Sequence, residues 1–123
     1  MFKKLFAVCL LVEDFEKSLS FYRDVLKLEV NETDSGFANF KLGETSLAVF
    51  QRDGAESMFP ARHMGRTGGL VLAFQVTDVQ KVVEELQSKG VEVFEGPKTT
   101  EWGQTVAYFK DPDGNIWEVS NLD

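Results

Sequence analysis

The chain contains two copies of one local pattern, a short apolar run followed by an aspartate and then by a helical apolar stripe. The first copy begins near residue 5 and the second near residue 70. The matching positions are Leu10 with Phe74, Val12 with Val76, Asp14 with Asp78, Lys17 with Lys81, Leu19 with Val83 and Tyr22 with Leu86. Because each copy of a repeat forms the same supersecondary structure, the chain is limited to folds built from two similar units.

Each copy predicts a strand that leads directly into a helix. In the first copy, Phe15, Leu19, Tyr22 and Leu26 are spaced by three or four residues, which is typical of one helix face. The aspartate before each helix is expected to be its N-cap, because a carboxylate can accept a hydrogen bond from a free backbone amide of the first turn. Gly90 is expected to end the second helix.

Short β-rich runs separated by turn residues follow each helix. The expected strands are 5–12, 28–33, 36–42 and 46–51 in the first half, and 70–76, 91–95, 104–110 and 115–120 in the second. The sequence Asp111-Pro-Asp-Gly114 predicts a tight hairpin turn, which accounts for its aspartates without a catalytic role. Both halves therefore predict a βαβββ unit. The expected fold class is α+β, with two tandem βαβββ units forming a curved mixed sheet and helices on the convex face.

The length of 123 residues and the apolar content of 43% fit one domain that can bury a core without disulfides. We expect a single domain over 1–123, with a first unit of about 1–52, a linker of about 53–68 and a second unit of about 69–123. The long irregular segment from Arg52 to Gly69 is typical of lids, binding loops and mobile linkers. Met58 and Phe59 favour a partly packed lid, and a solvated connector explains the segment equally well.

Charge and hydropathy exclude several classes of function. The formal net charge of −7 disfavours nucleic-acid binding, would attract a cationic ligand and favours solubility. No run is long enough to span a bilayer, and the apolar stretch after Lys3 and Lys4 lacks a signal-peptide cleavage site, so we expect a cytoplasmic protein. Cys9 is the single cysteine, and its apolar neighbours predict a buried, inert thiol.

Two segments carry a resemblance to a known family. They are VEDFEKSLSFY, from Val12 to Tyr22, and WGQTVAYFKDPDGNIWE, from Trp102 to Glu118. Together with the repeat, they resemble the vicinal oxygen chelate superfamily, which includes glyoxalase-type lyases, extradiol dioxygenases, fosfomycin-resistance transferases and bleomycin-resistance proteins. The resemblance covers essentially the whole chain. It implies the paired βαβββ fold, and it leaves the function open because the superfamily supports several chemistries on one scaffold.

The resemblance also implies where a divalent metal would be held. Enzymes of the superfamily use four positions, in the first and fourth strands of each half, and these are typically His and Glu. The corresponding residues here are Ala7, Ala48, Val71 and Glu118. Alanine and valine carry no electron pair that can bind a metal, and a lone carboxylate makes no selective site. We therefore expect no metal, no cofactor and no metal-dependent catalysis.

Period-two alternation predicts which residues accompany these four positions on the face of the sheet. Cys9 and Leu11 would share a face with Ala7, Phe50 with Ala48, Ala73 and Gln75 with Val71, and Ile116 and Ser120 with Glu118. Glu118 would then be an acid on an apolar face, able to pair with a ligand amine or to bond a neighbouring side chain. The candidate ligand-binding residues are Glu118, Phe40, Phe50, Trp102, Tyr108, Cys9, Gln75, Arg62 and His63.

These observations favour a metal-free binding protein for a small organic molecule. Bleomycin-resistance-type members of the superfamily bind a drug and sequester it as dimers, so the resemblance implies a homodimer that holds an antibiotic or a metabolite. The first alternative is a glyoxalase-like lyase, an isomerase or a dioxygenase with an atypical site, or an acid–base enzyme that uses Glu118 with Tyr108 or His63. The second is an interaction module whose cleft is filled by its own side chains.

Overall fold

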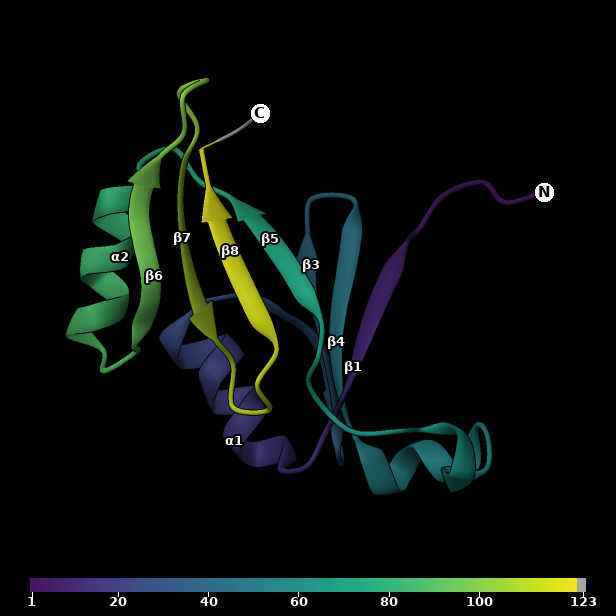
Figure 1. Cartoon of the computed structure of the whole chain (residues 1–123). Helices are drawn as coiled ribbons and strands as arrows, with labels where there is room; N and C mark the ends of the chain where they lie inside the picture. Colours follow the sequence, from purple (N-terminus) through teal and green to yellow (C-terminus); the bar gives the residue numbers. More distant parts are fainter. Residues whose placement is uncertain (122–123) are drawn as a thin grey trace. The chain divides into compact units, whose positions relative to one another are not determined.

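The computed structural model describes residues 1–121. The chain divides into two compact units, Met1–Thr67 and Gly68–Asp123. Each unit contains one four-stranded mixed sheet and one α-helix, and in each the chain runs from a strand through the helix to three further strands (Figure 1). The predicted βαβββ order is therefore present in both units.

The sheet of the first unit has the strand order β1-β4-β3-β2. Its strands are β1 (Ala7–Val12), β2 (Val30–Asp34), β3 (Phe37–Leu42) and β4 (Thr45–Gln51). β1 runs parallel to β4, and the other neighbouring strands are antiparallel. The parallel pair requires a crossover between β1 and the later strands, and the helix lies in that crossover.

The sheet of the second unit repeats this arrangement in the order β5-β8-β7-β6. Its strands are β5 (Val71–Gln75), β6 (Val93–Thr99), β7 (Thr105–Lys110) and β8 (Ile116–Ser120). β5 runs parallel to β8, as β1 does to β4. The register is equivalent too, since Cys9 is paired with Ala48 and Ala73 with Glu118. Residues at matching positions of the sequence repeat therefore occupy equivalent positions in the two sheets.

Both helices begin at the aspartates that the sequence predicts. A side-chain oxygen of Asp14 accepts from the backbone N–H of Lys17, and Asp78 accepts from that of Lys81, each at 3.1 Å. α2 (Val79–Ser88) is followed by Gly90 with a φ of +82°, a conformation that favours glycine. No helix within residues 1–121 is long and apolar enough to cross a membrane.

The first helix is shorter than its apolar spacing predicts. α1 covers Phe15–Ser20, and the chain then widens into a π-helical turn, η1 (Phe21–Val25). The backbone N–H of Leu26 bonds the carbonyl of Phe21, five residues earlier, at 2.9 Å. A wider turn changes the angular spacing of the side chains, which apolar periodicity alone does not reveal.

Each unit builds its core between its helix and one face of its sheet. In the first unit, Phe15, Leu19 and Tyr22 are buried with Leu10, Val12, Phe40, Leu47 and Val49. In the second, Val79, Val83 and Leu86 are buried with Phe109, Trp117 and Val119. The rings of Phe74 and Trp117 stack at 4.2 Å between centroids. Each large buried side chain stabilises the fold by roughly 1.5–3 kcal/mol. The opposite face of each sheet carries no α-helix of its own unit in the described part of the chain, and it is called the helix-free face below.

The turn before β8 is held by side-chain hydrogen bonds. Oδ1 of Asp111 accepts from the backbone N–H of Asp113 at 3.0 Å and from that of Asn115 at 2.8 Å, and Oδ2 accepts from the Asn115 amide at 2.9 Å. Gly114 has a φ of +88°. Asp111 is buried in this network, as expected for a turn residue.

The segment after β4 is more regular than the sequence suggests. It contains two 3-10 helices, η2 (Arg52–Ser57) and η3 (Ala61–His63), both within the first unit. Ala55 is fully buried, and the Arg52 guanidinium donates to the carbonyl of Gly65 at 2.6 Å. Part of this segment is therefore packed against the first unit.

Candidate functional site

The strand register places all four predicted metal-ligand positions on the helix-free faces of the two sheets. In the first unit, Ala48 is opposite Cys9, and Ala7 lies two residues from Cys9 on the same face. In the second unit, Glu118 is opposite Ala73, and Val71 lies two residues from Ala73. The alternation predicted from the sequence therefore agrees with the strand pairing.

The chemistry of these four residues does not fit a divalent metal. Ala7, Ala48 and Val71 have hydrocarbon side chains, so Glu118 supplies the one donor group of the set. Zinc, iron and manganese sites in enzymes are built from three or more His, Cys, Asp or Glu side chains. Within residues 1–121, no group of three such side chains is arranged to hold a metal ion.

Glu118 is hydrogen-bonded to a tyrosine on the neighbouring strand. Tyr108 of β7 is directly opposite Glu118 of β8, and the Tyr108 hydroxyl donates to Oε1 of Glu118 at 2.7 Å. This bond to the carboxylate is the main reason that the pKa of Tyr108 is raised, with desolvation as a second cause. Oε2 of Glu118 has no hydrogen-bond partner among the described residues. The carboxylate is thus oriented by Tyr108 and keeps one oxygen for another donor.

Aromatic and cationic side chains surround Tyr108. Phe94 of β6 makes an edge-to-face contact with Tyr108, with ring centroids 6.2 Å apart. Nζ of Lys98 lies 6.0 Å from the Tyr108 ring and also 3.5 Å from a carboxylate oxygen of Glu95. Nζ of Lys110 lies 5.3 Å from the Phe94 ring. Phe94 and Tyr108 therefore form a partly exposed aromatic surface beside the acid.

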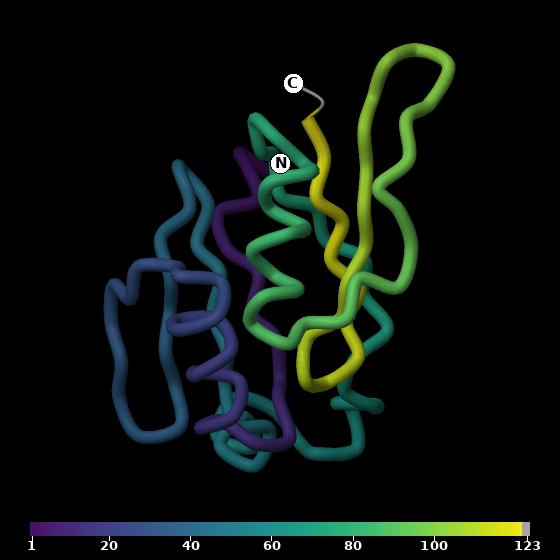
Figure 2. The backbone as a smooth tube through the Cα atoms, turned by 90° about the vertical axis from the view of Figure 1, so that its left-hand side faces the viewer, coloured from purple at the N-terminus to yellow at the C-terminus, as the bar shows by residue number. Residues whose placement is uncertain are grey.

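A second polar chain links the β6–β7 hairpin to the same sheet. The indole N–H of Trp102 donates to Oε1 of Gln104 at 3.1 Å, and Nε2 of Gln104 donates to the Ser120 hydroxyl at 3.0 Å. Ser120 is opposite Gln75 on β5. The hairpin tip projects from the strands of its own unit (Figure 2), and Trp102 is 73% exposed. Trp102 is thus a tethered aromatic side chain at the surface.

Two candidates from the sequence lie elsewhere than expected. The predicted buried thiol is wrong, because Cys9 is exposed on the helix-free face, although partial desolvation raises the pKa of its thiol. Phe40 was expected on the wall of a cleft, but it is fully buried on the helix side of β3, with its ring centroid 6.0 Å from that of Tyr22. Adjacent residues of a strand point to opposite faces of the sheet, and Phe40 is at one of the positions that face the helix.

The remaining candidates fall into two groups. Gln75, Tyr108 and Glu118 share one face of the second sheet. Phe50 lies on the helix-free face of the first sheet, and Arg62 and His63 are exposed in η3 of the first unit. Gln104 and Phe94 could not be identified as site residues from the sequence, because nothing in their local pattern distinguishes them from their neighbours.

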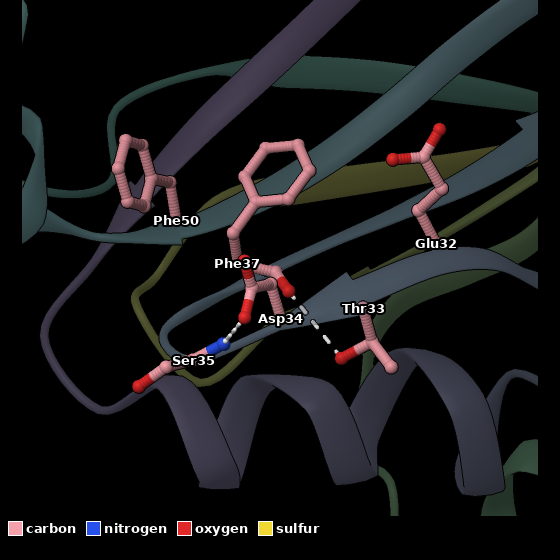
Figure 3. A pocket seen from close by; sticks show the side chains of 6 residues that line it. All are labelled: Glu32, Thr33, Asp34, Ser35, Phe37 and Phe50. Atoms are coloured by element: carbon pink, nitrogen blue, oxygen red, sulfur yellow. Dashed lines mark hydrogen bonds between the residues drawn. The ribbon is translucent and has the colours of Figure 1, made fainter.

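The described structure also contains hollows within the individual units. One, of about 410 Å³, lies at the end of β5 and is lined by Gln75, Val76, Thr77 and Asn121. Another, of about 430 Å³, lies in the first unit at the β2–β3 turn and is lined by Glu32, Thr33, Asp34, Ser35, Phe37 and Phe50 (Figure 3). Both are of a size that accommodates a small organic molecule.

The chain is similar in sequence to known proteins. The family model described as Glyoxalase/Bleomycin resistance protein/Dioxygenase superfamily matches residues 4–119. The Bacillus subtilis protein YraH is 35% identical over 97% of this chain and 98% of its own length. Metallothiol transferase FosB of Staphylococcus saprophyticus is 27% identical over 88% of this chain and 70% of its own length.

Solved structures show the same fold. A glyoxalase/bleomycin resistance protein/dioxygenase from Nocardioides matches with a TM-score of 0.81 and 25% identity, over 98% of this chain and 83% of that one. A lactoylglutathione lyase from Agrobacterium tumefaciens matches with a TM-score of 0.75 and 27% identity, over 95% of this chain and 92% of that one.

Proposed function

Because the chain belongs to the glyoxalase/bleomycin resistance protein/dioxygenase superfamily, we propose that it is a binding protein that captures a small organic molecule without a metal. The binding surface is the helix-free face of the second sheet, around Glu118 and Tyr108. A role in sequestering an antibiotic and a role in holding a metabolite are both compatible with this chemistry, because each needs an apolar, aromatic surface and one matching polar group.

One observation carries the proposal. Of the four positions that hold the metal in the enzymes of the superfamily, Glu118 alone keeps a donor, and its Oε1 is already bonded by Tyr108. Ala7, Ala48 and Val71 carry hydrocarbon side chains, so a single carboxylate bonded to a phenol is better suited to a ligand N–H than to a cation that needs several ligands.

The surroundings favour a ligand that carries a positive or hydrogen-donating group next to an apolar body. Oε2 of Glu118 can accept from such a group, and the rings of Phe94 and Tyr108 offer apolar contact. The net charge of −7 attracts cations at long range. Lys98 and Lys110 flank the aromatic pair and would repel a cationic group. The cationic group of the ligand would therefore be placed at Glu118 rather than near β6.

Two relatives carry enzyme names, a metallothiol transferase and a lactoylglutathione lyase. The raised pKa of Tyr108 keeps its phenol protonated at neutral pH, so Tyr108 would not act as a general base. A homodimer is part of the proposal, because β1 and β5 are edge strands of their sheets, and light scattering after size exclusion would test it.

Thermal shift assays test the proposal with three probes: bleomycin as a cationic glycopeptide, menadione as a quinone and S-hexylglutathione as a thiol conjugate. At least one probe is expected to raise Tm, because a ligand that binds only the folded state stabilises it by mass action. Glu118→Gln should weaken that effect, whereas Glu92→Gln, at an exposed position before β6, should leave it unchanged. The proposal is overturned if no probe raises Tm, or if the two variants bind equally well.

A further inference from the structure

The hollow on the first unit has a floor made of two aromatic rings. Phe37 of β3 is directly opposite Phe50 of β4, and their rings meet edge to face at 88° with centroids 5.6 Å apart. Phe50 also packs closely over Gly54, where an added Cβ would lie 2.8 Å from Cε1 of the ring. Both rings are only partly buried. The floor is therefore held in place while part of its aromatic surface remains accessible.

Carboxylates supply the charge of this hollow. The side chain of Glu32 rises from the same side of the sheet as the two rings (Figure 3), and its backbone N–H is fixed by Oδ1 of Asn39 at 2.9 Å. The Glu32 carboxylate has no hydrogen bond or ion pair within residues 1–121. Oδ1 of Asp34 accepts from the backbone N–H of Ser35 at 2.7 Å. The lining contains two acids and no basic residue.

We propose that this hollow is a second ligand site, which binds a small organic cation of the alkylammonium or quaternary ammonium class. The faces of aromatic rings attract cations, and Glu32 supplies the opposite charge from the rim. An anion would meet two carboxylates and no cation, and a neutral molecule would gain only the apolar contact. The volume of about 430 Å³ is sufficient for such a ligand.

This site is separate from the proposed Glu118 site in its residues and in its unit. The Glu118 site offers a hydrogen-bonded carboxylate beside Tyr108, whereas the hollow offers a free carboxylate beside two phenylalanines. The two proposals can therefore fail independently.

Choline and its neutral isostere 3,3-dimethylbutan-1-ol are suitable probes, because they share a shape and differ in charge. Titration followed by amide chemical shifts is expected to move the signals of residues 32–37 and 50 with choline and to leave them nearly unmoved with the isostere. Glu32→Gln and Phe37→Leu should each weaken choline binding about threefold to fivefold. The rim substitution Glu32→Gln removes charge from an exposed side chain and so tests the site without a core change.

Two control variants complete the experiment. Glu44→Gln, at an exposed turn of the same unit, and Glu92→Gln, at an exposed position before β6, should both bind choline as the unaltered protein does. The inference is overturned if the isostere binds as well as choline, if Glu32→Gln has no effect, or if the amides of residues 32–37 and 50 do not shift with choline.

Discussion

The hydroxyl of Tyr108 donates a 2.7 Å hydrogen bond to Oε1 of Glu118 from the directly opposite position on the neighbouring strand. The two side chains stand on the face of the second sheet that its own helix leaves free. Tyr108 therefore orients the acid before any ligand arrives, and the aromatic contact with Phe94 helps to hold the phenol in place. Preorganisation of this kind lowers the entropic cost of ligand binding.

The pKa of Tyr108 is expected to fall when Glu118 is replaced by glutamine. The bond to the Glu118 carboxylate is the largest cause of the raised pKa, and glutamine removes the negative charge. Because the folded-state pKa is raised, this pair stabilises the fold below the ordinary tyrosine pKa of 10.0 and stops doing so as pH rises through the raised value. Absorbance of the phenolate checks this, with Tyr108→Phe used to subtract Tyr22. An unchanged midpoint in Glu118→Gln would contradict the assignment.

The two N-caps are expected to be equivalent in strength, because they have the same geometry in both units. Asp78→Ala and Asp14→Ala should each lower the free energy of unfolding by about 1 kcal/mol, and Asp→Asn at either position by less. Urea unfolding measures both changes. A loss near zero for either alanine variant would show that the carboxylate does not cap the helix.

Much of the fold could be predicted from the sequence because its signals are local. The aspartates at 14 and 78 mark helix starts by their capping chemistry, and Gly90 marks a helix end by its backbone freedom. Apolar spacing does not report a π-helical turn, so the end of α1 was predicted too late. The repeat and its turn residues predict the βαβββ order along the chain, but no local signal predicts that β1 lies beside β4 in the sheet.

The site was less predictable because it depends on register and on which face is covered. Cys9 lies in an apolar run, yet the alternation of side chains along β1 places it on the helix-free face. Phe40 is an aromatic residue that could line a cleft, but the alternation of side chains along β3 places it in the core. The pairing of Tyr108 with Glu118 does have a signal, since counting outward from the Asp111–Asn115 turn aligns the two residues.

Aromatic residues on the two faces of the sheets should differ in their effect on stability. Phe40→Ala should cost about 3–5 kcal/mol of unfolding free energy, because Phe40 is fully buried. Phe94→Ala should cost less than about 1.5 kcal/mol, since Phe94 is 39% exposed and its ring interacts with Tyr108 and Lys110 at the surface. Urea unfolding of the two variants distinguishes the faces. Equal losses would mean that the assignment of core and open face is wrong.

The two tryptophans should be separable by fluorescence. Trp102 is 73% exposed, whereas Trp117 is 3% exposed and stacked on Phe74. Acrylamide should therefore quench the emission of Trp102 strongly and that of Trp117 weakly. In Trp102→Phe, the strongly quenched component should be absent. If Trp102→Phe leaves the quenchable fraction unchanged, the hairpin tip does not expose its indole in solution.

The proposed ligand role of Glu118 rests on Ala7, Ala48 and Val71, which leave it without partners for a metal ion. Isothermal titration of chelator-treated protein with Zn²⁺, Mn²⁺ and Ni²⁺ tests it most directly. We expect no saturable stoichiometric site for any of the three ions, with the same result for Glu118→Gln, because Ala7, Ala48 and Val71 offer no donor atoms. A saturable site of one ion per chain that Glu118→Gln abolishes would contradict it.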